Sequence, residues 1–179
     1  LVAAVAGSSA GLAASVESPV IEVDFQPEIT TQVASRYVAE GDAFLDGLTV
    51  TVSKGTWIHL DGKPVEVIAT GTLYGPFDEQ PTEADAPPVG APVAGTETVT
   101  LTGAGSYTSP GTIIAPESGF YTWVWSIDKD AHGENAKYLT DSFTDRFGQV
   151  AETSVVPFQP IAVSEADQRL AIPGDALTD

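Results

Sequence analysis

The first residues in this chain that could do chemistry form a short acidic cluster. Residues 128–135 read DKDAHGEN, in which carboxylates alternate and a glycine holds the sixth position, as at the start of a calcium loop. The twelfth position is Leu139 where an EF-hand has Glu, so the segment does not encode an EF-hand. Two interpretations stay open: a simpler calcium site made by Asp128, Asp130 and Glu134, or an exposed acidic turn, which the pattern favours. Calcium is the one cofactor that the sequence suggests.

Residues of the kinds that catalyse reactions are scarce. The chain has two histidines, His59 and His132, and no G-x-S-x-G motif to frame a serine nucleophile. Glycoside hydrolysis would need two carboxylates facing each other across a cleft. The acidic residues are numerous enough, but no insertion larger than residues 75–95 could form that cleft. We therefore expect a protein that is not an enzyme.

These side chains belong to a sequence that repeats itself over the length of a domain. Residues 25–46, FQPEITTQVASRYVAEGDAFLD, match residues 158–179, FQPIAVSEADQRLAIPGDALTD, at one offset, 158 − 25 = 133. Both FQP motifs, both Gly-Asp pairs and both final aspartates coincide. A period of this length is the size of a whole domain. We expect one full repeat over 25–158, preceded by residues 1–24 and followed by the start of the next repeat over 159–179.

The first fifteen residues, LVAAVAGSSAGLAAS, allow two interpretations. Small apolar residues resemble the end of a signal peptide and its cleavage site. The run lacks a basic region and is interrupted by Gly-Ser-Ser, so we favour the closing strands of a preceding repeat. Both interpretations place the protein outside the cell, and no apolar run of membrane-spanning length is present.

Charge and composition exclude several partners and chemistries. The net charge is −18, from 25 acidic and 7 basic residues, so the chain should repel nucleic acid and anionic lipid. It has no cysteine, which excludes disulfides, thiol nucleophiles and cysteine-ligated zinc. Because secreted eukaryotic modules of this size often carry disulfides, a bacterial surface is the more natural location.

Alternating apolar and β-branched residues between turn sequences predict an all-β domain with little helix. Residues 75–95 are rich in proline, alanine and acidic residues and predict a long surface loop. Short strands at these intervals are typical of an immunoglobulin-like antiparallel β-sandwich. The strands are expected over residues 29–33, 44–52, 56–60, 65–73, 96–101, 120–127 and 149–156.

The aromatic residues support one further prediction and one alternative function. Tyr121, Trp123, Trp125 and Ile127 alternate along 120–127, and the opposite face is also apolar, so this strand should lie in the centre of a sheet with both tryptophans in the core. The alternative is a carbohydrate- or host-protein-binding module whose platform would be Trp57, Trp123 and Trp125.

Several segments carry a resemblance to a known family. GTLYGPF (71–77), GFYTWVWSI (119–127), DRFGQVAET (145–153) and the paired GDAFLD and GDALTD are similar to the Ig-like, prealbumin-like repeats of actinobacterial cell-wall-anchored adhesin stalks. The resemblance implies a Gram-positive, sortase-anchored protein with many repeats. It also implies a cysteine pair near the long loop and the last strand. Here Ala86 and Phe147 stand at about those positions, so that clamp is missing.

The same resemblance implies that a covalent side-chain bond ties the first strand to the last. An isopeptide needs a first-strand lysine, but Lys54, Lys63, Lys129 and Lys137 all lie elsewhere. An ester resembling that of Thr–Gln domains would use Thr30 or Thr31, and its partner position is Glu152. Because Glu has no ammonia to release and the family's histidine is absent, an unreactive threonine and glutamate are the favoured interpretation.

The expected function follows from the repeat. We expect a structural repeat of a bacterial surface protein, a spacer, stalk or fibre unit for adhesion, whose partners are neighbouring repeats and a host or environmental surface ligand. Phe25, Pro27, Phe158 and Pro160 are expected at stiff interdomain junctions, since proline restricts its own backbone and that of the residue before it. Each Phe is expected to pack into the end of the repeat it leaves.

Overall fold

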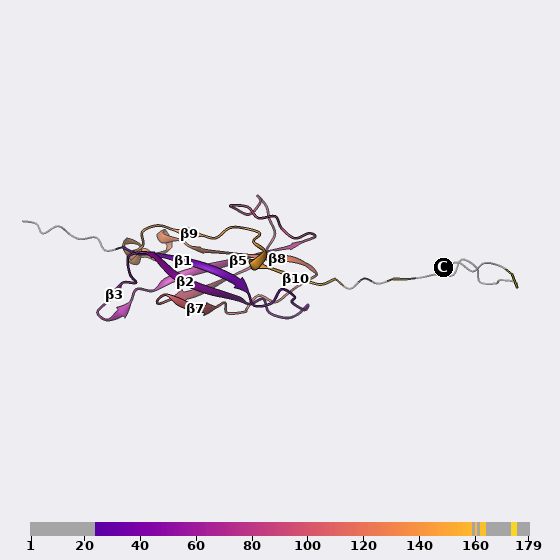
Figure 1. Cartoon of the computed structure of the whole chain (residues 1–179), viewed down its shortest axis with the longest axis horizontal. Helices are drawn as coiled ribbons and strands as arrows, with labels where there is room; N and C mark the ends of the chain where they lie inside the picture. Colours follow the sequence, from indigo (N-terminus) through magenta and orange to yellow (C-terminus); the bar gives the residue numbers. More distant parts are fainter. Residues whose placement is uncertain (1–23, 159, 161, 164–172, 175–179) are drawn as a thin grey trace, which may run out of the picture.

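Two antiparallel sheets enclose the core of this protein (Figure 1). The structure is a computed structural model that describes residues 24–158, 160, 162–163 and 173–174. The first sheet has the order β1–β2–β7: β1 (Gln26–Val33), β2 (Asp46–Lys54) and β7 (Gly105–Thr108). The second has the order β10–β8–β5–β6, with β9 beside β8: β5 (Val67–Phe77), β6 (Val93–Leu101), β8 (Gly119–Ile127), β9 (Phe143–Thr144) and β10 (Thr153–Val156).

The remaining elements are short. A small hairpin joins β3 (His59–Leu60) to β4 (Lys63–Pro64). Two 3-10 segments follow later, η1 (Lys129–Tyr138) and η2 (Val150–Glu152). The expected all-β class is confirmed. In the part of the chain that the structure describes, no helix has the length and apolar character needed to cross a membrane.

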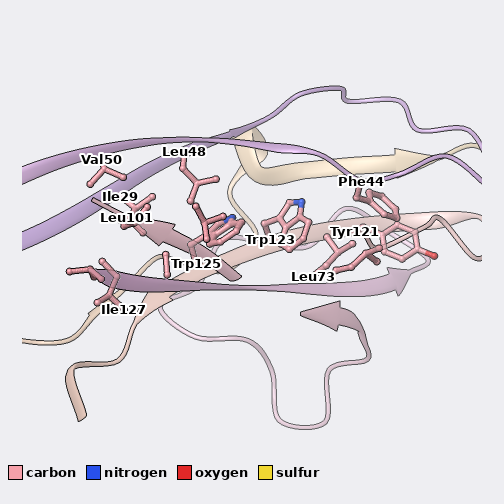
Figure 2. Packing of buried hydrophobic residues seen from close by; sticks show 14 of the residues in the cluster. Ile29, Phe44, Leu48, Val50, Leu73, Leu101, Tyr121, Trp123, Trp125 and Ile127 are labelled. Atoms are coloured by element: carbon pink, nitrogen blue, oxygen red, sulfur yellow. The ribbon is translucent and has the colours of Figure 1, made fainter. Parts of the chain in front are cut away.

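The core lies between the two sheets, where the alternating residues of each strand meet (Figure 2). Strand β8 runs between β5 and β10 and is buried on both faces, as its two-sided apolarity predicts. Trp123 and Trp125 have no exposed surface, and their rings stack with centroids 5.5 Å apart. The prediction that both tryptophans lie in the core is confirmed.

Several segments differ from the sequence prediction. The sequence does not predict β9, and β5 and β6 extend into the loop expected over 75–95. Residues 56–60 form a strand only at His59–Leu60, because the preceding Trp57 turns inward onto Phe25 and donates its indole N–H to the Val65 carbonyl at 2.9 Å. The last segment divides into η2 and a four-residue β10. Strand β7 was missed, because its GSYT sequence shows no alternation of apolar residues.

The first part of the chain contacts both sheets. After β1 in the first sheet, residues 36–38 run parallel to β10 in the second. The Val38 N–H donates to the Val155 carbonyl at 3.1 Å, and the Val155 N–H donates to the Arg36 carbonyl at 2.8 Å. The chain therefore enters the domain beside β1 at one end and leaves after β10 at the other (Figure 1).

The long loop is fastened where the resemblance implied a cysteine clamp. Ala84 and Phe147 exchange two backbone hydrogen bonds of 2.9 Å each. The buried Phe147 ring packs edge-on against Tyr74 and Phe77, at centroid distances of 5.8 and 5.9 Å. The bridge lies at Ala84, two residues before the Ala86 expected from the sequence. Backbone pairing and aromatic packing thus hold the loop between β5 and β6 without a disulfide.

Gly71 offers a test of this packing. A Cβ atom there would lie 2.6 Å from the Trp125 ring, so Gly71→Ala should overpack the core and lower the free energy of unfolding by about 1–3 kcal/mol. Gly103→Ala is the matched control, because nothing lies within 4 Å of the added Cβ atom, and it should stay within about 0.5 kcal/mol. Urea unfolding would measure both, and equal losses would contradict the packing.

Candidate functional site

A buried hydroxyl lies against a buried carboxyl group between the first and last strands. The alternation of β1 turns Thr30 outward and Thr31 inward, where Thr31 is 9% exposed. Glu152, the last residue of η2, is 2% exposed. Thr31 Oγ1 is hydrogen-bonded to Glu152 Oε1, across 121 residues of sequence. The two residues that the ester alternative would use are thus in direct contact.

Asp145 is the second carboxyl group beside the Thr31 hydroxyl. Its Oδ2 lies 3.4 Å from Thr31 Oγ1. Its Oδ1 accepts hydrogen bonds from Gln149 Nε2 at 2.6 Å and from the Arg146 backbone N–H at 2.7 Å. The Thr31 hydroxyl thus lies within reach of two carboxyl groups, those of Glu152 and Asp145.

Asp46 is the third carboxyl group and has no exposed surface. It is the first residue of β2, where its backbone N–H donates to Ser109 Oγ at 2.9 Å. Its Oδ2 accepts the indole N–H of Trp125 at 2.7 Å. The pair joins the first sheet to the second in the middle of the core.

Burial sets the protonation of this cluster. Loss of hydration raises the pKa of Asp46 to about 7, against an ordinary value of 3.8. Burial, followed by the charges of Asp46 and Asp145, raises the pKa of Glu152 to about 9. At neutral pH Glu152 is therefore an uncharged carboxylic acid in contact with a hydroxyl group.

Polar atoms without a partner gather near the same place. Among the described residues, the fully buried side-chain atoms that lack a hydrogen bond are Asp46 Oδ1, Trp123 Nε1 and Glu152 Oε2. Thr153 pairs with Thr122, so the antiparallel register places Glu152 next to Trp123. Figure 2 shows the Trp123 nitrogen on the side of the ring that faces the first sheet. Unpaired buried groups cost free energy and are rare in folded proteins, so their concentration here marks an unusual site.

The acidic segment 128–134 lies elsewhere on the surface. Asp128, Asp130 and Glu134 are exposed, and Asp128 caps η1 by accepting the Asp130 N–H at 3.1 Å. Within the described part of the chain, no three acidic or histidine side chains come close enough together to hold a metal ion. The capping role accounts for the spacing of the acidic residues. A calcium site here stays a prediction.

Both histidines have structural partners or lie on the surface. His132 Nε2 accepts the Ile68 N–H at 2.7 Å, and its Nδ1 donates to the Asp128 carbonyl at 2.6 Å. His59 is exposed, and its Nδ1 lies 3.1 Å from the Trp57 carbonyl oxygen. Neither lies beside a serine nucleophile.

The junction residues behave differently from the expectation. Phe25 is fully buried in the domain that it begins, while Phe158 is 77% exposed on the domain that it leaves. The expectation that each Phe packs into the preceding repeat is therefore wrong for Phe158. Pro27 is buried within β1, and Pro160 is exposed. The expectations for residues 1–15 lie outside the described residues.

Comparison of the chain with protein-family models and with curated proteins finds no match. The assignment of a role therefore depends on the geometry of the site.

Sequence reasoning identified Thr31 and Glu152 but missed the roles of Asp46 and Asp145. One signal was available in the repeat. Asp46 recurs as Asp179, and Thr31 corresponds to Ser164, since 179 − 46 and 164 − 31 both equal 133. A hydroxyl and a carboxyl group thus recur together at one spacing. Nothing in the sequence marks Asp145, whose position depends on how residues 143–149 fold over β8.

The raised pKa values predict a loss of stability as pH rises. The folded state binds more protons than the unfolded state between pH 4 and 7 at Asp46, and up to pH 9 at a free Glu152, so the free energy of unfolding falls across that range. Asp46→Asn should keep the Trp125 hydrogen bond and remove the Asp46 share of the fall, which lies between pH 4 and 7. Urea unfolding at a series of pH values would measure this, and an identical slope in the variant would contradict the burial of an ionisable Asp46.

Proposed function

We propose that this chain is a load-bearing structural repeat, a stalk or spacer unit of a bacterial cell-surface protein, folded as an immunoglobulin-like β-sandwich and closed by an ester between Thr31 and Glu152. The observation that carries the proposal is the buried contact of Thr31 Oγ1 with Glu152 Oε1, which joins β1 to the residue that precedes β10. The resemblance to adhesin stalk repeats and the internal repeat support the same role.

The position of this bond suits a domain that is pulled from its two ends. Tension applied through Phe25 and Pro157 would pass along β1 to Thr31, cross to Glu152 and leave along β10. The 121-residue step between the bonded residues would carry no load. Without the bond, the same force would act along β1 and would be resisted only by its hydrogen bonds to β2. A covalent link therefore converts a folded domain into an inextensible unit.

The condensation balances with the groups present. Thr31 Oγ1 attacks the Cδ carbon of the neutral Glu152 acid while Asp145 accepts the hydroxyl proton. The tetrahedral intermediate then loses its OH group, which takes the proton back from Asp145 and departs as water. One C–O bond forms and one breaks, and no oxidant or reductant is needed. The unpaired Trp123 N–H is available as a donor to the oxygen that becomes negative in the intermediate.

Burial also favours the product over the reactants. Condensation of an uncharged acid with an alcohol is nearly thermoneutral, so the outcome depends on concentration. Well-oriented groups within one molecule have effective molarities of about 10⁵ M or more, far above the concentration of liquid water. Because Glu152 is uncharged, no ionisation energy opposes the reaction. Exclusion of water from the core then slows hydrolysis of the ester.

The binding-module alternative has no observation in its favour. Trp123 and Trp125 are fully buried, and Trp57 is half-buried against Phe25, so the three do not form a surface platform. The partners we propose are neighbouring repeats on the outside of the bacterial cell, and the chain itself performs no turnover reaction on a substrate.

Mass spectrometry tests the ester. The intact chain should be lighter than its sequence by one water molecule. Trypsin cleaves after Arg36, Arg146 and Arg169, so peptides 1–36 and 147–169 should elute as one linked species. Hydroxylamine, which cleaves esters and not amides, should separate them.

Matched variants distinguish the chemistry from the fold. Thr31→Val keeps the shape and should show the full mass with two separate peptides, whereas Thr31→Ser should keep the linked species. Asp145→Asn should slow the appearance of the bond after refolding. A folded wild-type chain with the full mass, and with the fall in stability extending to pH 9 expected of a free Glu152, would rule the ester out.

Mechanical pulling tests the load-bearing role. Held through residues 24 and 157, the wild-type domain should not lengthen by more than a few residues before the tether breaks. Thr31→Val should release the segment between the two bonded positions, a gain of about 400 Å for 121 residues at about 3.5 Å each. An equal gain in both proteins would mean that the site carries no load.

A further inference from the structure

We infer that Phe158 is the first core residue of the following repeat and that Pro157 alone separates two successive cores, so that the end of this domain around Arg36, Tyr37 and Phe120 is a docking face for that repeat. The inference rests on the proposed array of repeats. It does not depend on the ester, and the experiment below separates the two.

Phe25 shows what this position does in a repeat. Its side chain is fully buried, with its ring centroid 4.9 Å from that of Trp57. Its N–H donates to the Tyr138 carbonyl at 2.9 Å, and its carbonyl accepts the Thr140 N–H at 3.0 Å. The next residue is also fixed, because Gln26 Oε1 accepts the Asp141 N–H at 2.9 Å. The Phe and Gln of the FQP motif are therefore parts of the domain they begin.

Phe158, which begins the same motif after β10, is not buried in the present domain. Phe158 and Gln159 repeat Phe25 and Gln26 at the offset of 133 residues. Phe158 is 77% exposed, although it immediately follows a strand whose last residue, Val156, is 1% exposed. Phe158 holds the position that Phe25 holds in this repeat, yet Phe25 is buried and Phe158 is exposed. The difference is explained if Phe158 packs into the core of the next repeat.

The spacing leaves almost no linker. Only Pro157 lies between Val156 and Phe158, and two Cα steps of about 3.8 Å span at most about 7.6 Å. The residue before Phe25 is itself held, because a Cβ added to Gly55 would lie 2.5 Å from the Asp24 carbonyl oxygen. Pro157 occupies the position of Asp24 in the next repeat, so its carbonyl should rest on the corresponding glycine turn. The two domains must then touch.

The face that they would cover has a suitable character. A groove at the exit of the chain is lined by Arg36, Tyr37, Phe120 and Pro157, together with Phe158 itself. Tyr37 is 70% exposed, even though its backbone lies beside Val155 of β10. Exposed aromatic rings next to a buried strand end favour a protein contact. Since the chain leaves through this groove, the occupant is the first turn of the following repeat.

A tandem protein tests the inference. Residues 24–157 followed directly by residues 25–157 preserve the native order Val-Val-Pro-Phe-Gln-Pro at the junction. The described domain contains its whole core within 25–156, so each unit can fold by itself. With segmental isotope labelling, the amide resonances of Arg36, Tyr37 and Phe120 in the first unit should shift relative to the single repeat. Small-angle scattering should give one extended shape with little flexibility.

Two variants decide the outcome. Junction Phe→Ala should lower the thermal midpoint of the second unit alone, as Phe25→Ala should in a single repeat, while Phe158→Ala in the present chain should change nothing. Four Gly-Ser residues inserted after Pro157 should restore the single-repeat resonances and make the tandem flexible. Unshifted amides, or a junction Phe→Ala that leaves the second unit unchanged, would overturn the inference. Ester formation is scored separately by mass, so a failure of the ester is distinguished from a failure of the docking.

Discussion

The contact between Thr31 and Glu152 is the interaction on which the rest of the structure depends. It connects the first sheet to the element that precedes the last strand, and it can exist only because the site excludes water. Exposed, Glu152 would be ionised and hydrated, and its carboxylate would be a poor electrophile. Buried, it is a neutral acid beside a hydroxyl. The same burial raises the pKa of two carboxyl groups, those of Asp46 and Glu152.

The large aromatic residues create that environment. The indole N–H of Trp125 donates to Asp46 at 2.7 Å, and its ring stacks on Trp123. One side chain thus supplies both a hydrogen bond to the buried carboxyl group and apolar packing around it. Gly71 on β5 leaves the space that the Trp125 ring fills. The buried carboxyl group of Asp46 therefore accepts an indole hydrogen bond in place of water, and its side-chain partner is not a cation. This fits a chain with 25 acidic and only 7 basic residues.

The two ends of the domain carry the same Phe-Gln-Pro sequence in different surroundings. Phe25 fills the core beside Trp57 at one end, and the chain leaves the other end with Phe158 exposed. Along the side, the aromatic ring of Phe147 and a backbone bridge to Ala84 hold the loop between β5 and β6. A domain without cysteine is therefore held by packing at the loop and by the buried hydrogen bond between Thr31 of β1 and Glu152 next to β10. Both features suit a unit that is stacked end to end.

The sequence by itself determined the all-β class, the central position of β8 and the burial of its tryptophans, because alternation along a strand directly encodes which face is apolar. It also identified Thr31 and Glu152 as the residues that an ester between the first and last strands would use. It could not decide that Asp46 and Asp145 surround them, nor that Phe158 is exposed while Phe25 is buried. Local patterns report the face of a strand. Which faces meet, and which charged groups lose water together, depends on how two sheets pack across more than a hundred residues, and only the tertiary structure decides that.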